Sequence, residues 1–226
     1  MRISLVIPAM KEEEGIKKTL SNIPYSKLKK NGYDIETIVV WTPTEDDKTG
    51  EIADKMGAEV IIEKRRGYGR AYKTGFQNTN GDIIATLDAD CTYPVEKIPE
   101  LINLLECEKI DFITTDRFAD LERGIMKPLH RFGNFILTLW MNLLFGLKIN
   151  DSQSGMWVFR KKILDAIQLK ENGMTFSSEI KIKAFKKFKI REVPIKYKRR
   201  EGVSKISSLK DGFAHVKYMF RERLGF

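Results

Sequence analysis

The sequence predicts a single α/β domain whose mostly parallel central sheet is sandwiched by helices. Short runs of β-branched residues with little polar alternation are typical of strands buried on both faces. These runs alternate with stretches that carry apolar residues at helical spacing, the order expected of a parallel sheet with helical crossovers. With 226 residues, 42% of them hydrophobic, and no low-complexity linker, one domain over residues 1–226 is expected.

Each expected element follows from such a run. The expected strands cover 2–8, 35–41, 58–62, 82–88 and 111–115, and the expected helices cover 12–23, 46–57, 70–79 and a segment that begins near Pro94. Proline is favoured in the first turn of a helix, because its missing N–H would have no partner there. The fifth strand, "DFITT", therefore follows a helix, as the fourth does.

Net charge and cysteine content indicate which ligands the protein could bind and whether it carries disulfides or a zinc site. The net charge is +9, and basic residues dominate the stretch from Lys181 to Lys210, which attracts phosphates of nucleic acid, lipid headgroups or a substrate. The alternative is a solvated helix face. Two cysteines provide neither a disulfide framework nor a zinc site, and "MRISLVIPAM" is typical of a first strand rather than of a signal peptide. We therefore expect a cytoplasmic protein.

Two aspartates mark the end of the fourth strand, in "ATLDADCTYP". In open α/β sheets, ligands bind beyond the carboxyl ends of the strands. Asp88 and Asp90, two residues apart, can face one small hard cation there, and Mg²⁺ or Mn²⁺ takes its other ligands from water and substrate phosphates. The alternative is that both side chains cap the turn before the next helix.

A glycine-containing block, "RRGYGRAYKTGF", follows the third strand and begins a helix. Gly67 and Gly69 permit close approach of a ligand to the backbone. The block is not a dinucleotide fingerprint, because the third glycine has the wrong spacing and the block does not follow the first strand.

A lipid-binding surface is predicted by the stretch near 128–147. Asn134, Thr138 and Asn142 recur every four residues on an otherwise apolar helix with Arg131 and Lys148 at its ends, which favours a helix lying in a membrane interface. A second amphipathic helix is expected near 207–223. The alternative is that the first of these helices is ordinary buried core.

Five blocks in this order resemble the family 2 glycosyltransferases of the GT-A fold, in particular the dolichyl-phosphate and polyprenyl-phosphate mannose and glucose synthases. The blocks are "LVIPAMKEEEGI", "RRGYGRAYKTGF", "GDIIATLDADCTYP", "DSQSGMWVFRKKIL" and "IREVPIKYKRREGVSK". The resemblance implies a nucleotide-sugar donor, Mg²⁺ or Mn²⁺, a lipid phosphate acceptor and an inverting transfer. It also divides the chain into a nucleotide-sugar-binding half, 1–120, and an acceptor half, 121–226.

The resemblance further implies roles for particular residues. Nucleotide-sugar binding falls to Pro8, Glu12, Asp46, Gly67, Asp88, Ala89, Asp90, Arg200 and Lys205; metal binding to Asp88 and Asp90; acceptor-phosphate binding to Arg117, Arg131 and Asn134; and catalysis to Asp90, Arg117, Arg131 and Arg200. The chain departs from the family pattern at Met10, Lys11 and Thr92. After the second strand, either Asp46 or Asp47 stands for the family's aspartates.

The expected reaction is transfer of a hexose to dolichyl or polyprenyl phosphate at the cytoplasmic membrane face, with peripheral membrane contact and no nucleic acid. A phosphate is already anionic and needs no general base, whereas a sugar hydroxyl needs a carboxylate. Transfer to a sugar hydroxyl of a glycolipid or polysaccharide, with Glu179 as base, is one alternative. A basic membrane- or nucleic-acid-binding module is another. The donor is UDP-glucose, UDP-N-acetylglucosamine or GDP-mannose; the sequence leaves this and the oligomeric state open.

Overall fold

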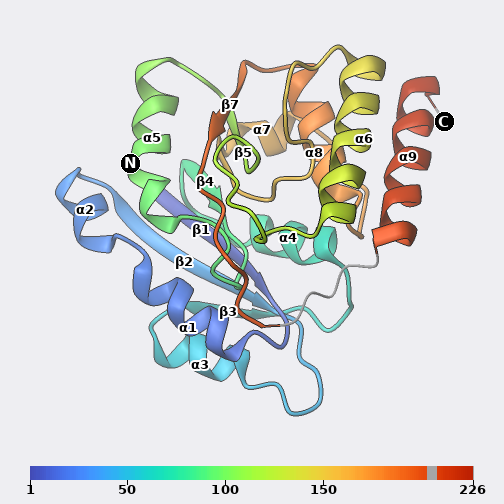
Figure 1. Cartoon of the computed structure of the whole chain (residues 1–226). Coiled ribbons are helices and arrows are strands. Elements are labelled where there is room, and N and C mark those ends of the chain that lie inside the picture. Colours follow the sequence, from blue (N-terminus) through green and yellow to red (C-terminus); the bar gives the residue numbers. More distant parts are fainter. Residues whose placement is uncertain (203–207, 226) are drawn as a thin grey trace.

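A seven-stranded sheet forms the centre of the computed structural model, which describes residues 1–202 and 208–225 (Figure 1). The strand order is β3-β2-β1-β4-β6-β5-β7. The strands are β1 (Arg2–Ala9), β2 (Asp34–Trp41), β3 (Glu59–Ile62), β4 (Ile83–Thr86), β5 (Phe112–Asp116), β6 (Trp157–Arg160) and β7 (Ile190–Pro194). The predicted α/β class and the five predicted strands are confirmed.

Two strands were not predicted, and one of them runs against the others. β6 is antiparallel to both of its neighbours, β4 and β5, whereas the remaining pairs are parallel. β6 thus joins the sheet half built from β1 to β4 to the half built from β5 and β7.

Helices cover both faces of the sheet. They are α1 (Glu13–Asn22), α2 (Tyr25–Lys30), α3 (Thr49–Lys55), α4 (Tyr68–Gln77), α5 (Ile98–Cys107), α6 (Pro128–Phe145), α7 (Lys162–Ala166), α8 (Phe176–Phe185) and α9 (Ser208–Leu224). One core joins the sheet to α1, α2, α3 and α5, and a second joins it to α4, α7 and α8. The alternation along β1, where Leu5 enters the first core and Val6 the second, explains why its run is continuously apolar.

An outer layer is formed by α6 and α9, which lie side by side next to α8 (Figure 1). The polar stripe of α6 faces inward: Thr138 bonds Ser152, and Asn142 bonds the backbone of Ile149. The outward face is apolar and exposed. Its members on α6 are Leu129, Phe132, Phe135, Leu139 and Leu143, and those on α9 are Phe213, Phe220 and Leu224. Among the described residues, no helix is long and apolar enough to span a bilayer.

Candidate active site

A cavity of about 260 Å³ opens at the carboxyl ends of β1 and β4. It is lined by Pro8, Ala9, Met10, Glu12, Thr42, Arg66, Gly67, Tyr68, Ala71, Asp88, Ala89, Asp90, Met174 and Arg200. Seven residues predicted to bind the nucleotide sugar thus gather around one cavity: Pro8, Glu12, Gly67, Asp88, Ala89, Asp90 and Arg200.

Asp90 is buried and held in one orientation. Its Oδ1 accepts hydrogen bonds from the backbone N–H and the hydroxyl of Thr92, at 3.1 and 2.6 Å. Its Oδ2 lies 2.7 Å from Nη1 of Arg200. Thr92, one of the departures from the family pattern, therefore fixes the rotamer of the second aspartate.

Arg200 links Glu12, in the loop between β1 and α1, to Asp90. Its Nη2 lies 2.6 Å from Oε1 of Glu12, the residue that precedes α1. The backbone around Arg200 runs beside the Asp90 loop, because the N–H of Glu201 donates to the carbonyl of Asp90. One guanidinium thus bridges two carboxylates from distant parts of the chain.

Asp88 has the electrostatics of a cation ligand. Burial, followed by the charge of Asp90, raises the pKa of its carboxyl to about 7, although Arg200 and Arg117 act in the opposite direction. Within residues 1–202 and 208–225, its carboxylate accepts no hydrogen bond from the protein. A divalent cation would compensate the charge of both carboxylates, so the donor set fits Mg²⁺ or Mn²⁺.

Two glycines allow the loops of the cavity to pack closely. Gly67 has φ of +146°, a conformation that disfavours side chains, and a Cβ there would lie 2.4 Å from the carbonyl oxygen of Asn172. A Cβ on Gly15 in α1 would lie 2.4 Å from the carbonyl oxygen of Ala89. Larger residues at either position would displace the loops that shape the cavity.

The aspartates that follow β2 differ in environment. Asp46 is exposed and does not line the cavity. Asp47 is buried, and its carboxylate accepts hydrogen bonds from the indole of Trp41, from Thr49 and from the backbone of Lys11. Asp47 therefore holds the loop between β1 and α1 in place without lining the cavity itself.

Six lining residues were not predicted: Ala9, Thr42, Arg66, Tyr68, Ala71 and Met174. Arg66 and Tyr68 belong to the "RRGYGRAYKTGF" block, so their place in that motif was an available signal. Met174 comes from the loop before α8, about one hundred residues further along the chain. No local pattern links it to the cavity.

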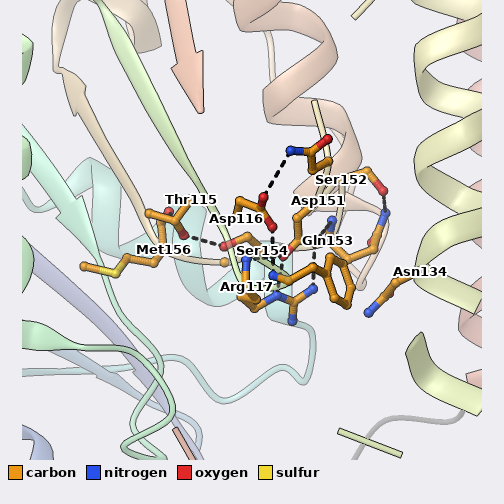
Figure 2. Close-up of polar contacts among 12 residues, drawn as sticks. Thr115, Asp116, Arg117, Asn134, Asp151, Ser152, Gln153, Ser154 and Met156 are labelled. Atoms are coloured by element: carbon orange, nitrogen blue, oxygen red, sulfur yellow. Dashed lines mark hydrogen bonds and ion pairs between the residues drawn. The ribbon is translucent and has the colours of Figure 1, made fainter. Parts of the chain in front are cut away.

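Arg117 directly follows β5 and is buried against the 151–154 segment (Figure 2). Its Nε and Nη2 donate to the carboxylate of Asp151, at 2.6 and 2.9 Å, and its backbone N–H donates to the same group. Its guanidinium also lies over the ring of Tyr197. Because Arg117 contributes to the pKa of Asp88, its charge acts on the metal-ligand candidates.

The remaining predicted acceptor residues lie on α6. The side-chain amide of Asn134 donates to the sulfur of Met126, in the segment before this helix. Arg131 is exposed one turn earlier. Neither residue lines the cavity, and Lys205 lies outside the described residues.

Glu179, the base required by the alternative reaction, has its carboxylate bound to other protein groups. It is 1% exposed, and its carboxylate accepts hydrogen bonds from the backbone N–H groups of Lys170 and Glu171 and pairs with Lys183. It does not line the cavity. This pattern is that of a residue that anchors the loop before α8.

Comparison with known sequences identifies a family. The sequence profile described as "Glycosyl transferase family 2" matches residues 4–168. A low-salt glycan biosynthesis hexosyltransferase of Haloferax volcanii, Agl6, is 36% identical over 99% of this chain, which spans 54% of that relative. A dolichyl-phosphate hexose transferase of the same organism is 32% identical over 98% of the chain and 96% of its own length. A dolichol-phosphate mannosyltransferase of Pyrococcus furiosus is 28% identical over 98% of the chain and 63% of its own length.

Solved structures share the fold. Glucosyl-3-phosphoglycerate synthase from Mycobacterium tuberculosis, in complex with Mn²⁺, UDP and glucosyl-3-phosphoglycerate, matches with a TM-score of 0.75 and 22% identity, over 99% of this chain and 80% of that one. The same enzyme with phosphoglyceric acid matches with a TM-score of 0.78. These matches confirm the predicted GT-A fold, and the family profile over residues 4–168 confirms the family resemblance of the sequence blocks.

Proposed function

The chain belongs to glycosyl transferase family 2, and we propose that it transfers a hexose from a nucleotide sugar to dolichyl or polyprenyl phosphate. The names of two relatives motivate the acceptor. The observation that carries the proposal is the pairing of a carboxylate-lined cavity with a buried arginine whose charge acts on Asp88. Such a site suits two anionic substrates that must meet.

The donor side provides both carboxylates and a cation. Asp88 and Asp90 would hold Mg²⁺ or Mn²⁺, which would neutralise the oxygens of the departing diphosphate. Arg200 is well placed to donate to the same phosphates, because its guanidinium lies at the cavity and presents a planar fork. Glu12 orients that guanidinium through the 2.6 Å ion pair.

The acceptor side needs cations rather than a base. An oxygen of the lipid phosphate attacks the anomeric carbon, the bond from that carbon to the diphosphate breaks, and the nucleoside diphosphate leaves. Arg117 and Arg131 hold the acceptor phosphate in this scheme. Asn134 lies on α6 with Arg131. The commitment of Glu179 to the backbone and to Lys183 favours a phosphate over a hydroxyl acceptor.

A transfer assay tests the proposal. The purified protein is incubated with UDP-glucose, UDP-N-acetylglucosamine or GDP-mannose and a short-chain polyprenyl phosphate in detergent, with Mg²⁺, with Mn²⁺ or with excess chelator. We expect hexosyl polyprenyl phosphate by mass spectrometry, from one donor above the others and only with metal. Full activity in chelator would remove the metal from the scheme. Thermal shift with each donor guides the choice, because a ligand that binds only the folded state stabilises it.

We also propose that the apolar face of α6 and α9 rests on the cytoplasmic face of a membrane. Leu143 is 72% exposed and Phe213 73% exposed, and the ends of α6 carry the exposed cations Lys127, Arg131 and Lys148. Apolar side chains flanked by cations suit an interface that contains anionic lipid. A lipid acceptor would then reach the site along this face.

Vesicle co-sedimentation tests this contact. Replacing Phe132 and Leu143 together by serine should lower affinity for vesicles with anionic lipid by on the order of 10-fold or more, since each side chain loses roughly 1 kcal/mol of partial burial. Ile62→Ser, at a residue 55% exposed on β3, is the matched control and should change nothing. Equal binding by all variants would contradict the membrane contact.

A further inference from the structure

The loop between α6 and β6, residues 150–155, is a junction of hydrogen bonds from many elements (Figure 2). The Thr115 hydroxyl of β5 bonds that of Ser154, the hydroxyl of Tyr93 accepts from the N–H of Gly155, and Glu192 of β7 accepts from the N–H of Asp151. Hydrogen bonds from β5, β7 and Tyr93 thus restrain the conformation of this loop.

One buried cation lies behind this loop. Lys181 of α8 is fully buried, and its Nζ donates to the carbonyl oxygens of Asp151, Ser152 and Ser154, at 3.3, 2.8 and 2.8 Å. An ammonium group has three donors, and here each has a carbonyl partner in the same loop. Burial lowers the pKa of Lys181 to about 7, whereas Asp151 favours its charged form.

The same loop controls the orientation of Arg117. The Asp151 carboxylate receives Nε and Nη2 of Arg117 in a fork, and it also accepts the backbone N–H of Gln153. The fork uses one edge of the guanidinium and leaves Nη1 outside it. The orientation of this remaining edge therefore depends on where the Asp151 backbone is held.

The loop also reaches the donor side. A Cβ on Gly155 would lie 2.4 Å from the hydroxyl of Tyr68 and 3.7 Å from Oδ1 of Asp88. A shift of the loop would therefore move Arg117 relative to the carboxylates that face the donor. Displacements of this kind are costly in catalysis, because reacting groups must meet in a narrow geometry.

We propose that Lys181 is a positioning residue for acceptor binding: by holding three carbonyls of the 151–154 segment, it fixes Asp151 and thereby the edge that Arg117 presents to the acceptor phosphate. This inference rests on the proposed function. Lys181 itself touches neither substrate in this scheme. Its loss should therefore act on the acceptor and spare the donor.

The test compares Lys181→Met with Lys183→Met. Lys183 is on the same helix, but its ammonium contacts Gln168 and Glu179 instead of the loop. Lys181→Met should raise the KM for polyprenyl phosphate at least about tenfold and leave the dissociation constant of the nucleotide, measured by titration calorimetry, within about twofold. Lys183→Met should change neither. A folded Lys181→Met with unchanged acceptor KM, or with an equal loss of nucleotide binding, would overturn the proposal.

A second readout needs no turnover. The Nε–H of Arg117, buried against Asp151, should give a protected ¹H–¹⁵N signal in the wild type and in Lys183→Met, and a shifted or rapidly exchanging one in Lys181→Met. An unchanged signal would overturn the positioning role. If the wild type shows the signal but transfers no sugar to lipid phosphate, the proposed function fails instead. Should the methionine variant not fold, Lys181→Gln, which keeps a donor, should give the same pattern at smaller size, and its absence would count equally against the proposal.

Discussion

The two sides of the site differ in how their charged side chains are paired. On the donor side, Glu12 and Asp90 share one guanidinium, that of Arg200, and Asp88 lines the same cavity without an ion pair among the described residues. On the acceptor side, two buried cations contact Asp151: Arg117 donates to its carboxylate, and Lys181 donates to its backbone carbonyl.

The difference indicates what each side binds. On the donor side, Glu12, Asp88 and Asp90 are in excess over the two arginines that line the cavity, Arg66 and Arg200, and burial, followed by the charge of Asp90, raises the pKa of Asp88. A metal ion that arrives with a diphosphate would relieve this excess. On the acceptor side, the fork with Asp151 leaves Nη1 of Arg117 outside it, and a phosphate would contact this edge. In the proposed scheme, a single fold therefore holds two anionic substrates without a carboxylate base between them.

The largest expected effect is on the donor side. Asp90→Asn should reduce transfer on the order of 100-fold or more, because a metal ligand contributes several kcal/mol of transition-state stabilisation. The amide retains an acceptor for Thr92 but loses the ion pair with Arg200, so unfolding should cost only about 1–3 kcal/mol less. Steady-state transfer beside chemical denaturation measures both. If the loss of transfer, expressed as a free energy, were no larger than the loss in the free energy of unfolding, Asp90 would have a structural role only.

His215 of α9, buried where its Nδ1 bonds the hydroxyl of Ser178, should resist protonation in the folded protein. Burial, and then the charge of Lys181, lowers the pKa of His215 to about 4, below the ordinary value of 6.5. The unfolded chain therefore binds more protons between these values, and His215 should destabilise the fold by up to about 3 kcal/mol as pH falls from 6.5 to 4. Denaturation of wild type and His215→Gln across this range isolates the effect. Parallel curves for the two proteins would contradict it.

Variants on the two sides should affect the binding of different substrates. Arg131→Ala should raise the KM for polyprenyl phosphate by about 10- to 150-fold and spare nucleotide binding, if one charged hydrogen bond of about 1.5–3 kcal/mol is lost. Arg200→Ala should weaken nucleotide-sugar binding by a similar factor. Titration with nucleotide alone, beside steady-state transfer, resolves the two. Loss of nucleotide binding in Arg131→Ala would break the division into donor and acceptor sides.

The smallest effect on transfer is expected at Glu179. Glu179→Gln should lower transfer by less than about threefold, because a phosphate acceptor needs no base. Its stability should fall by about 1–3 kcal/mol, since the charge that holds Lys183 and two backbone N–H groups is removed. Complete loss of transfer in a folded variant would support a hydroxyl acceptor.

Local patterns predicted the first five strands and the position of Asp88 and Asp90 after a strand, because buried β-branched runs and strand ends are visible in the sequence; the roles of the two aspartates remain a prediction. The antiparallel β6 was missed, since its four residues pair only through contacts far apart in the chain. The partnership of Arg117 with Asp151, 34 residues later, was invisible for the same reason. The polar stripe of α6 was correctly identified, but periodicity alone does not say which side of a helix faces the protein.

The most direct test of the central claim is a competition between acceptors. Wild-type protein receives one labelled nucleotide sugar and equal amounts of a polyprenyl phosphate and of a glycolipid with free sugar hydroxyls, and the products are identified by mass spectrometry. The predicted product is hexosyl polyprenyl phosphate, formed in large excess over any extended glycolipid. A product consisting of the extended glycolipid alone would contradict the claim that this site unites two anionic substrates.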